Sequence, residues 1–146
     1  MAESNNAKTR TVRDVMSSPA LTATPSETVA EAAERMAAHR VGSVIVVDGD
    51  RPIGILTERD LVRFAGSGSD PSGTKVSEWM TGDPDTVEPD AEVTAAWASL
   101  AERGYRHIPV VEGDRLVGIV SMRDLMKIAQ IRPVDGTIDV PLGLAG

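Results

Sequence analysis

The amino-acid sequence predicts an α+β protein built from two copies of one β-α-β-β-α unit. The first observation is an internal repeat, because a shift of 64 positions aligns the chain with itself from Val12 to Leu61 without a gap. The second is the order of patterns in each copy, where a helical spacing of apolar residues precedes two continuous apolar strands. The matched pairs include Val12/Val76, Met16/Met80, Thr22/Thr86, Pro25/Pro89, Val29/Val93, Val46/Val110, Val47/Val111, Gly54/Gly118 and Asp60/Asp124.

Each copy begins with a short lead-in that closes at a methionine, Met16 or Met80, and continues into a short extended segment. A helix follows, for which we predict Ser26 and Asp90 as N-caps because each comes directly after a proline. Gly104 is the predicted end of the second helix, since glycine readily adopts the left-handed conformation found at helix ends. The apolar faces of the two helices are Val29, Ala32, Ala33, Met36 and Ala37, and Val93, Ala96, Trp97, Leu100 and Ala101.

A β-hairpin follows the helix in each copy. Its first strand is Val41–Val47 or Ile108–Val111, and an acidic turn with a central glycine leads into the second strand, Pro52–Leu56 or Leu116–Val120. Apolar residues fill these strands without alternation, which predicts that both faces of each sheet are covered. The acids of the two turns could suggest a cation site, but turn chemistry explains them better.

One motif ends each hairpin and opens the last helix of the copy. It has the form Gly-apolar-apolar-(Thr/Ser)-x-Arg-Asp-Leu, at Gly54–Leu61 and at Gly118–Leu125. The hydroxyl residue, Thr57 or Ser121, occupies the N-cap position, and the acid three places later is placed for a capping box. Capping alone explains a single copy, whereas recurrence in two matching units makes the motif a candidate binding element.

The composition argues against several classes of function. Without cysteine, the chain has no disulfide, thiolate zinc site or cysteine nucleophile. Its formal net charge of −7 argues against non-specific binding to nucleic acid or anionic membranes. No apolar run approaches the roughly 20 residues that span a bilayer, and the polar start is no signal peptide, so we expect a cytoplasmic protein. We find no nucleophile–base set, phosphate loop or metal signature, and expect no enzyme.

The repeat and its motif together resemble the cystathionine-β-synthase (CBS) domain pair. The resemblance covers Thr11 to Ile128 and includes Met16-Ser17, Met80-Thr81 and the Arg-His-Ile-Pro-Val-Val of Arg106–Val111. It implies a pseudo-twofold module with two clefts between the repeats and a disc-like homodimer. The expected organisation is an arm at 1–10, repeats at 11–64 and 75–129, a flexible Gly/Ser-rich linker at 65–74 and an irregular tail at 130–146.

The resemblance also implies a ligand, because many CBS pairs bind AMP, ADP or ATP in their clefts and some bind S-adenosylmethionine. Such a module would be regulatory, for example in energy sensing, and would need no catalytic cofactor. One cleft would use Ile55, Thr57 and Asp60 with Asp85, Val87, Arg106 and His107. The other would use Ile119, Ser121 and Asp124 with Leu21, Ala23, Val41, Gly42 and Ser43.

Each residue type suits a part of an adenine nucleotide. Asp60 and Asp124 can accept hydrogen bonds from a ribose diol, and the helix starts offer free N–H groups to a phosphate. Arg59, Arg123 and Arg106 are candidates to neutralise phosphates. Repeat 2 has Arg106-His107 where repeat 1 has Gly42-Ser43, so we expect unequal clefts. We expect the cleft with Asp60, Arg106 and His107 to favour a phosphate-bearing ligand.

The residues leave alternatives open. The motifs could serve only as helix caps, and His107 could be structural. The chain would then be a ligand-free scaffold that dimerises through the helices carrying Met36 and Leu100, or Leu61 and Leu125. The tail Ile138–Gly146 faintly resembles the lead-in of bacterial citrate synthases, which would make the chain an amino-terminal regulatory part of a longer enzyme. The sequence does not name the regulated partner.

Overall fold

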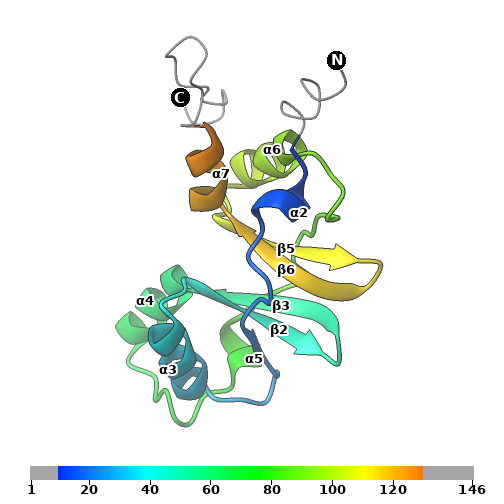
Figure 1. The fold of residues 1–146 in the computed structure, drawn as a ribbon. Coiled ribbons are helices and arrows are strands. Elements are labelled where there is room, and N and C mark those ends of the chain that lie inside the picture. Colours follow the sequence, from blue (N-terminus) through cyan, green and yellow to red (C-terminus); the bar gives the residue numbers. More distant parts are fainter. Residues whose placement is uncertain (1–9, 130–146) are drawn as a thin grey trace, which may run out of the picture. The chain divides into compact units, whose positions relative to one another are not determined.

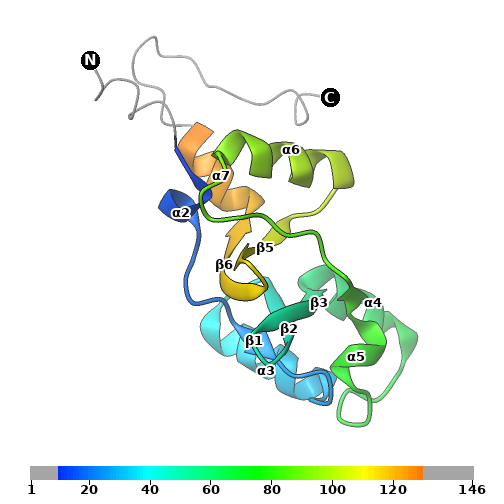
Figure 2. The same ribbon diagram turned by 90° about the vertical axis from the view of Figure 1, so that its right-hand side faces the viewer.

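The computed structural model describes residues 10–129, without the side chains of residues 128 and 129, so the predicted tail and most of the predicted arm lie outside the described residues. The chain forms two compact units (Figures 1 and 2). Within the described residues, unit 1 contains 10–18, Thr86–Gly113 and 117–129. Unit 2 contains Pro19–Asp85 and Asp114–Leu116. The mixed α+β class predicted from the sequence is confirmed.

Unit 2 is built on a four-stranded sheet in the order β1-β2-β3-β4. The short strand β1 runs parallel to β2, whereas β2 with β3 and β3 with β4 are antiparallel. The strands are β1 (Thr22–Ala23), β2 (Ser43–Asp48), β3 (Arg51–Thr57) and β4 (Thr81–Gly82). The helices are α3 (Val29–His39), α4 (Glu58–Ser67) and α5 (Val76–Trp79).

Unit 1 repeats this arrangement 64 positions away. Its hairpin is extended by two isolated bridges, a parallel one between Val87 and Val110 and an antiparallel one between Ser17 and Ile119. These bridges match the pairs Ala23–Val46 and Thr81–Ile55 of the unit 2 sheet. The elements are α2 (Val12–Val15), α6 (Val93–Arg103), β5 (His107–Glu112), β6 (Arg115–Ser121) and α7 (Met122–Ala129).

The two repeats exchange their lead-ins. Val12, from the start of repeat 1, is fully buried in the core of unit 1 together with Leu100 and Val120 of repeat 2. Val76, from the start of repeat 2, is buried in the core of unit 2 with Leu56 of repeat 1. Each compact unit therefore consists of the body of one repeat and the lead-in of the other.

Close packing against the lead-in explains the glycine of the repeated motif. A Cβ added to Gly118 would lie 2.8 Å from both Met16 Sδ and the backbone oxygen of Ser17. At Gly54 an added Cβ would overlap Met80 Sδ in the same way. A side chain at either position would push the lead-in away from the sheet, so the motif needs glycine for packing.

The predicted N-caps of the first long helices were wrong by two residues. The N-cap of α3 is Thr28, whose hydroxyl accepts a hydrogen bond from Glu31 N at 3.1 Å. The N-cap of α6 is Glu92 rather than Asp90. Each proline lies inside a turn, such as that closed by Glu27 N and Thr24 O at 3.2 Å around Pro25, and the chain becomes helical only after this turn.

The predicted end of α6 is confirmed. Gly104 is its C-cap in the left-handed conformation, with φ of 73°. At the equivalent end of α3, the non-glycine residue Arg40 adopts the same conformation with φ of 56°. The first predicted strand, by contrast, begins at Ser43 rather than at Val41.

The segment 65–74, for which a flexible linker is expected, belongs to unit 2 and is hydrogen-bonded to α3. Its first residues belong to α4, which continues to Ser67. Further along, the backbone oxygens of Pro71 and Thr74 accept hydrogen bonds from Ala30 and Val29 at 3.0 and 2.9 Å. These two carbonyls satisfy amides that the first turn of α3 cannot pair internally.

Candidate functional site

The first copy of the repeated motif forms a capping box at the start of α4. Thr57 N donates to Asp60 Oδ2 at 2.9 Å, and Asp60 N donates back to Thr57 Oγ1 at 3.3 Å. The Asp60 side chain is buried, with 6% of the residue exposed. Its second oxygen, Oδ1, lies 3.4 Å from Nη1 of the largely exposed Arg63.

The second copy forms the same reciprocal bonds at the start of α7. Ser121 N donates to Asp124 Oδ2 at 3.0 Å, and Asp124 N donates to Ser121 Oγ at 3.1 Å. Asp124 is only half-buried. Among the described residues, Asp124 Oδ1 has no hydrogen-bond or ion-pair partner, in contrast to Asp60 Oδ1.

Capping therefore accounts for the carboxylates as well as for the hydroxyls. The same box occurs at Thr28 and Glu31, outside the repeated motif. There, the backbone N–H of Thr28 and then its hydroxyl hold the pKa of Glu31 below its usual value by hydrogen bonding to the carboxylate. A hydroxyl with an acid three residues later is thus a helix-start device in this chain, and a binding role needs additional groups around it.

Those additional groups come from the start of each hairpin. In unit 2, Ser43 is paired with Thr57 across β2 and β3, and Glu58 N donates to the backbone oxygen of Gly42 at 3.0 Å. In unit 1, Met122 N donates to the backbone oxygen of Arg106 at 2.8 Å. Each hairpin start therefore lies beside the start of the helix that follows the same hairpin.

This adjacency gives the two helix starts different charges. At the start of α7 the exposed Arg123 precedes Asp124, and the exposed Arg106 accepts the hydrogen bond from Met122 N through its backbone oxygen, with His107 next in the chain. The start of α4 has instead Glu58 and Arg59, which are both exposed, near the buried Asp60. The start of α7 therefore has more cationic surroundings than the start of α4, and it should attract an anionic ligand group more strongly.

The remaining predicted site residues lie on the sheets or close to their ends. Ala23 in β1 and Ile55 in β3 are buried, and Leu21 O accepts a hydrogen bond from Ile45 N at 2.9 Å. Val87 bridges to Val110, and Val41 is 39% exposed ahead of β2. Asp85, Ile119 and His107 are half-buried. Both predicted sets combine residues of the two units, so their assembly into clefts stays a prediction.

Between residues 10 and 129, no three histidine or acidic side chains lie together in a way that could hold a metal ion. No helix in the same part of the chain has the length and apolar character required to cross a membrane.

Comparison with known proteins shows the family. A profile of the CBS domain matches residues 12–67 and 76–130, so the chain belongs to the CBS domain family and carries two such domains. A CBS domain-containing protein of Bacillus subtilis, YhcV, is 36% identical over 115 residues, which are 78% of this chain and 81% of that protein. An uncharacterized protein of Methanopyrus kandleri, MK0525, is 38% identical over 120 residues, 80% of this chain and 61% of that protein.

The chain thus spans about three fifths of the length of the Methanopyrus relative.

Two similar solved structures contain ligands. The CBS domain pair of MJ0100, in complex with 5-methylthioadenosine and S-adenosyl-L-methionine, is 25% identical with a TM-score of 0.76 over 82% of this chain and 95% of that one. The CBS protein PAE2072 of Pyrobaculum aerophilum, complexed with AMP, is 25% identical with a TM-score of 0.74 over 79% and 89%.

Proposed function

We propose that the chain is a regulatory module that binds an adenosine-containing ligand, such as AMP, ADP, ATP or S-adenosylmethionine. Membership of the CBS family and the ligands named for MJ0100 and PAE2072 support this proposal. The observation that carries it in this chain is the start of α7, where Asp124 Oδ1 has no partner in the described residues and where Met122 N binds the backbone oxygen of Arg106. No catalytic step is part of the proposal, and a cytoplasmic location stays a prediction.

The groups at the start of α7 match the parts of a nucleotide. Asp124 Oδ1 can accept hydrogen bonds from the two ribose hydroxyls, because Oδ2 is already used by Ser121 N at 3.0 Å. Arg106 and Arg123 are exposed and can pair with phosphate oxygens, which a guanidinium binds in bidentate geometry. The positive end of the helix dipole adds to the attraction for the phosphate.

We propose a different grouping of the site residues from the one expected from the sequence. The sequence-based proposal combines Asp60 with Arg106 and His107. Within unit 1, however, Arg106 lies beside the helix start that carries Asp124. We therefore propose that Arg106 and Asp124 serve the same ligand, and that Asp60, whose Oδ1 faces Arg63, belongs to a second and less cationic site.

Ligand titration with thermal unfolding tests the proposal. A ligand at 100 times its Kd should stabilise the folded chain by about 2.7 kcal/mol, which corresponds to roughly 5 to 10 °C for a chain of this size. AMP, ADP, ATP, NADH and S-adenosylmethionine are each added up to millimolar concentration. A midpoint that none of them shifts would refute the proposed function. Asp124→Ala should abolish the shift by a phosphate-bearing ligand, whereas Asp60→Ala should retain it.

A second candidate function is a ligand-free homodimer that serves as an interaction scaffold. The large apolar side chains exposed in the described residues support it, because they occupy matching positions in the two repeats, Val41 with Tyr105 and Val62 with Met126. Light scattering that gives a dimer mass for a chain without affinity for adenosine compounds would favour this function. A role as the regulatory part of a longer enzyme rests on residues 138–146, which lie outside the described residues.

A further inference from the structure

One arginine of α4 contacts both the buried carboxylate of Asp60 and the ring of Trp79. Asp60 Oδ2 accepts hydrogen bonds from Thr57 N at 2.9 Å and from Thr57 Oγ1 at 3.1 Å, so the helix cap occupies this oxygen. Asp60 Oδ1 lies 3.4 Å from Arg63 Nη1. The carbon of the same guanidinium lies 6.0 Å from the centre of the Trp79 ring. Arg63 is therefore within reach of two different partners.

The ring of Trp79 is packed in place, whereas Arg63 is largely exposed. Phe64, which is only 5% exposed, meets the Trp79 ring edge-to-face, with 5.0 Å between the ring centroids and 83° between the ring planes. Trp79 is the last residue of α5, and the following Met80 packs against Gly54. The Arg63 side chain is 67% exposed. Its guanidinium can thus move between a buried carboxylate and a packed ring.

The contact of Arg63 with Asp60 is loose enough to be exchanged for another one. Hydrogen bonds from a cationic N–H to a carboxylate are usually about 2.7 to 2.9 Å long, and this one is 3.4 Å. Ion pairs that involve an exposed side chain also contribute little free energy. A guanidinium within about 6 Å of an aromatic face is attracted to that face. Displacement from Asp60 would therefore leave Arg63 with a second partner, Trp79.

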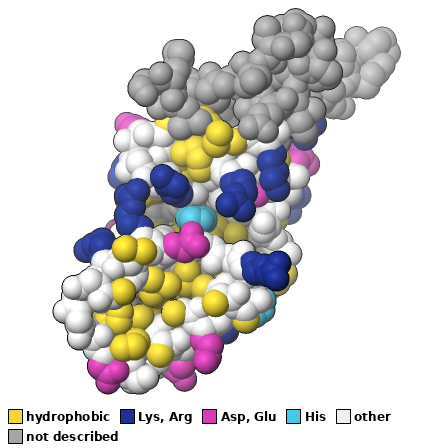
Figure 3. Space-filling model, turned by 90° about the vertical axis from the view of Figure 1, so that its left-hand side faces the viewer, with side chains coloured by type: hydrophobic (Ala, Val, Ile, Leu, Met, Phe, Trp, Pro, Cys, Tyr) yellow, Lys and Arg dark blue, Asp and Glu magenta, His cyan; other side chains and the backbone are white. Residues whose placement is uncertain are grey.

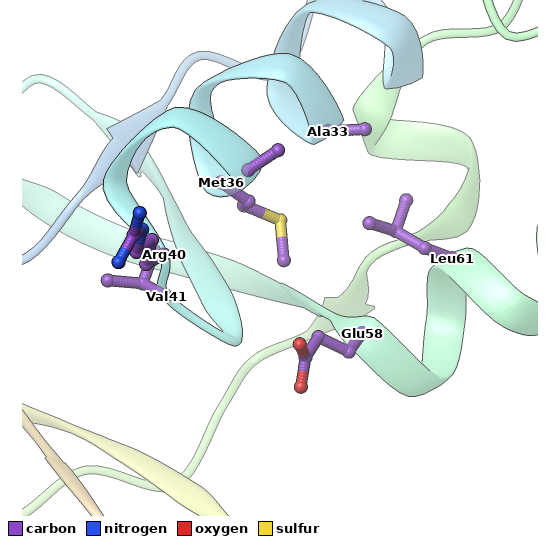
Figure 4. A pocket seen from close by; sticks show the side chains of 7 residues that line it. Ala33, Met36, Arg40, Val41, Glu58 and Leu61 are labelled. Carbon is purple, nitrogen blue, oxygen red and sulfur yellow. The ribbon is translucent and has the colours of Figure 1, made fainter.

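The other acid at this helix start, Glu58, does not replace Asp60 as the partner of Arg63. Figure 3 shows hydrophobic side chains gathered on the face of unit 2. Glu58 lies at the edge of an apolar groove of about 390 Å³, into which Met36 and Leu61 point (Figure 4). Within the described residues Glu58 has no ion-pair partner, and Arg63 pairs with Asp60 alone.

Unit 1 has no counterpart of this arginine and its aromatic pair. The residues aligned with Arg63, Phe64 and Trp79 are Lys127, Ile128 and Val15. In the part of the chain that the structure describes, Lys127 forms no ion pair, and Asp124 Oδ1 has no partner. Asp124 is thus available to a ligand without any displacement, whereas Asp60 must first lose Arg63.

We propose that Arg63 competes with the ligand for Asp60 and signals the occupancy of this site to Trp79. The ribose hydroxyls of an adenosine compound displace Arg63 from Asp60 Oδ1, and the freed guanidinium moves onto the Trp79 ring. The two compete because the cap already occupies Oδ2, which leaves Oδ1 as the acceptor for both. Binding at Asp60 thereby strengthens the contact between α4 and α5. This inference rests on the proposed function, since it requires a ribose at the second site.

Adenosine is the probe, because it has the ribose hydroxyls but no phosphate that an arginine could bind. The reference chain is the full chain with Trp97→Phe, which leaves Trp79 as the single tryptophan, and with Asp124→Ala, which removes the other proposed site. Adenosine is titrated while the fluorescence of Trp79 is measured, and equilibrium dialysis gives the Kd independently of fluorescence. Circular dichroism verifies that every variant is folded.

Two matched substitutions are added to the reference chain. Arg63→Met keeps an unbranched apolar side chain and removes the competing charge, so the Kd for adenosine should fall about two- to fivefold. The fluorescence change on binding should be largely lost, since no guanidinium moves onto the ring. Lys127→Met, at the aligned position of unit 1, should leave the Kd within about 1.5-fold and keep the fluorescence change. Asp60→Ala should remove both binding and the fluorescence change.

Salt provides a further readout, because adenosine carries no charge. Raising NaCl from about 0.05 to about 0.5 M screens the attraction between Arg63 and Asp60 and should tighten adenosine binding to the reference chain roughly twofold. The Arg63→Met variant should show no such tightening. A purely structural role of Arg63 would not produce this difference between the two chains.

Several results would overturn the inference. An unchanged Kd in Arg63→Met would exclude competition, and a raised Kd would show that Arg63 holds the ligand instead. An equal gain in affinity with Lys127→Met, or an undiminished fluorescence change in Arg63→Met, would also contradict it. If the unsubstituted chain binds adenosine and the reference chain does not, this inference fails while the proposed function stands. A chain that binds no adenosine compound contradicts both.

Discussion

The exchange of lead-ins between the repeats can be distinguished experimentally from a simpler arrangement in which each repeat keeps its own lead-in. In the structure, Gly54 of repeat 1 packs against Met80, which belongs to the lead-in of repeat 2. In self-contained repeats, Gly54 would instead contact Met16. The substitution Gly54→Ala, combined in turn with Met80→Ala and Met16→Ala, distinguishes the two arrangements in a double-mutant cycle.

The magnitudes follow from the space around each glycine. A Cβ at Gly54 would overlap the flexible Met80 side chain and lie 3.1 Å from the backbone oxygen of Thr81, so overpacking should cost about 1 to 3 kcal/mol. Met80→Ala removes the overlapping atoms, so the two changes should couple by about 0.5 to 3 kcal/mol. Gly118→Ala should resist rescue by Met16→Ala, since the Ser17 oxygen at 2.8 Å is backbone and stays in place.

Urea unfolding at fixed protein concentration measures the free energies of unfolding of the single and double variants. We expect Gly54→Ala to be coupled to Met80→Ala and additive with Met16→Ala to within about 0.5 kcal/mol. Gly66→Ala is the control, because nothing lies within 4 Å of its added Cβ in α4, and it should stabilise by about 0.5 to 1 kcal/mol. Coupling of Gly54→Ala to Met16→Ala alone would refute the exchanged arrangement.

Three further predictions concern the units and their caps. A fragment of residues 19–85 should give a more dispersed amide NMR spectrum than one of residues 11–64, because it keeps the lead-in that completes the unit 2 core; the reverse order would contradict the unit boundaries. Ser121→Ala should lower the free energy of unfolding by about 0.5 to 2 kcal/mol in urea, as Asp124 N loses its acceptor, and no loss would exclude a capping role. Hydrogen bonds from Thr28 lower the pKa of Glu31 in the folded state, so the contribution of ionised Glu31 to folding stability is present above its unfolded pKa and is lost as pH falls through the folded pKa. Glu31→Gln should therefore flatten the acid limb of a curve of unfolding free energy against pH, and an unchanged acid limb would count against this role.

The fold was predictable from the sequence because its signals are local and occur twice. The apolar spacing of α3 and α6, the turns at Gly49 and Gly113 and the left-handed end at Gly104 each follow from short-range patterns. The exchanged lead-ins were missed, since nothing within residues 12–17 indicates which of two equivalent sheets they join. Only the close approach to Gly118 could have suggested a partner for Met16, and glycine alone does not identify that partner.

The candidate site was predictable in its motif and less so in its grouping. The capping geometry of Thr57 with Asp60 follows from their spacing, and the structure contains it. The proximity of Arg106 to the start of α7 depends on how β5 and β6 pair, which spacing along the chain does not reveal. A groove between α3 and α4, which Ala33, Met36 and Leu61 help to line, was likewise missed, although Trp97 at the position aligned with Ala33 is a signal that a comparison of the two repeats could have used.

We propose that the start of α7 binds an adenosine compound through Asp124 and Arg106. Calorimetric titration of AMP into the full chain, and into Asp124→Ala and Arg106→Gly, tests this binding. Glycine is chosen at position 106 because Gly42 is the natural residue at the aligned position of repeat 1. We predict at least one AMP per chain for the wild type, loss of that site in Asp124→Ala, and an affinity about tenfold weaker in Arg106→Gly. AMP binding with unchanged stoichiometry and affinity in both variants would contradict the claim.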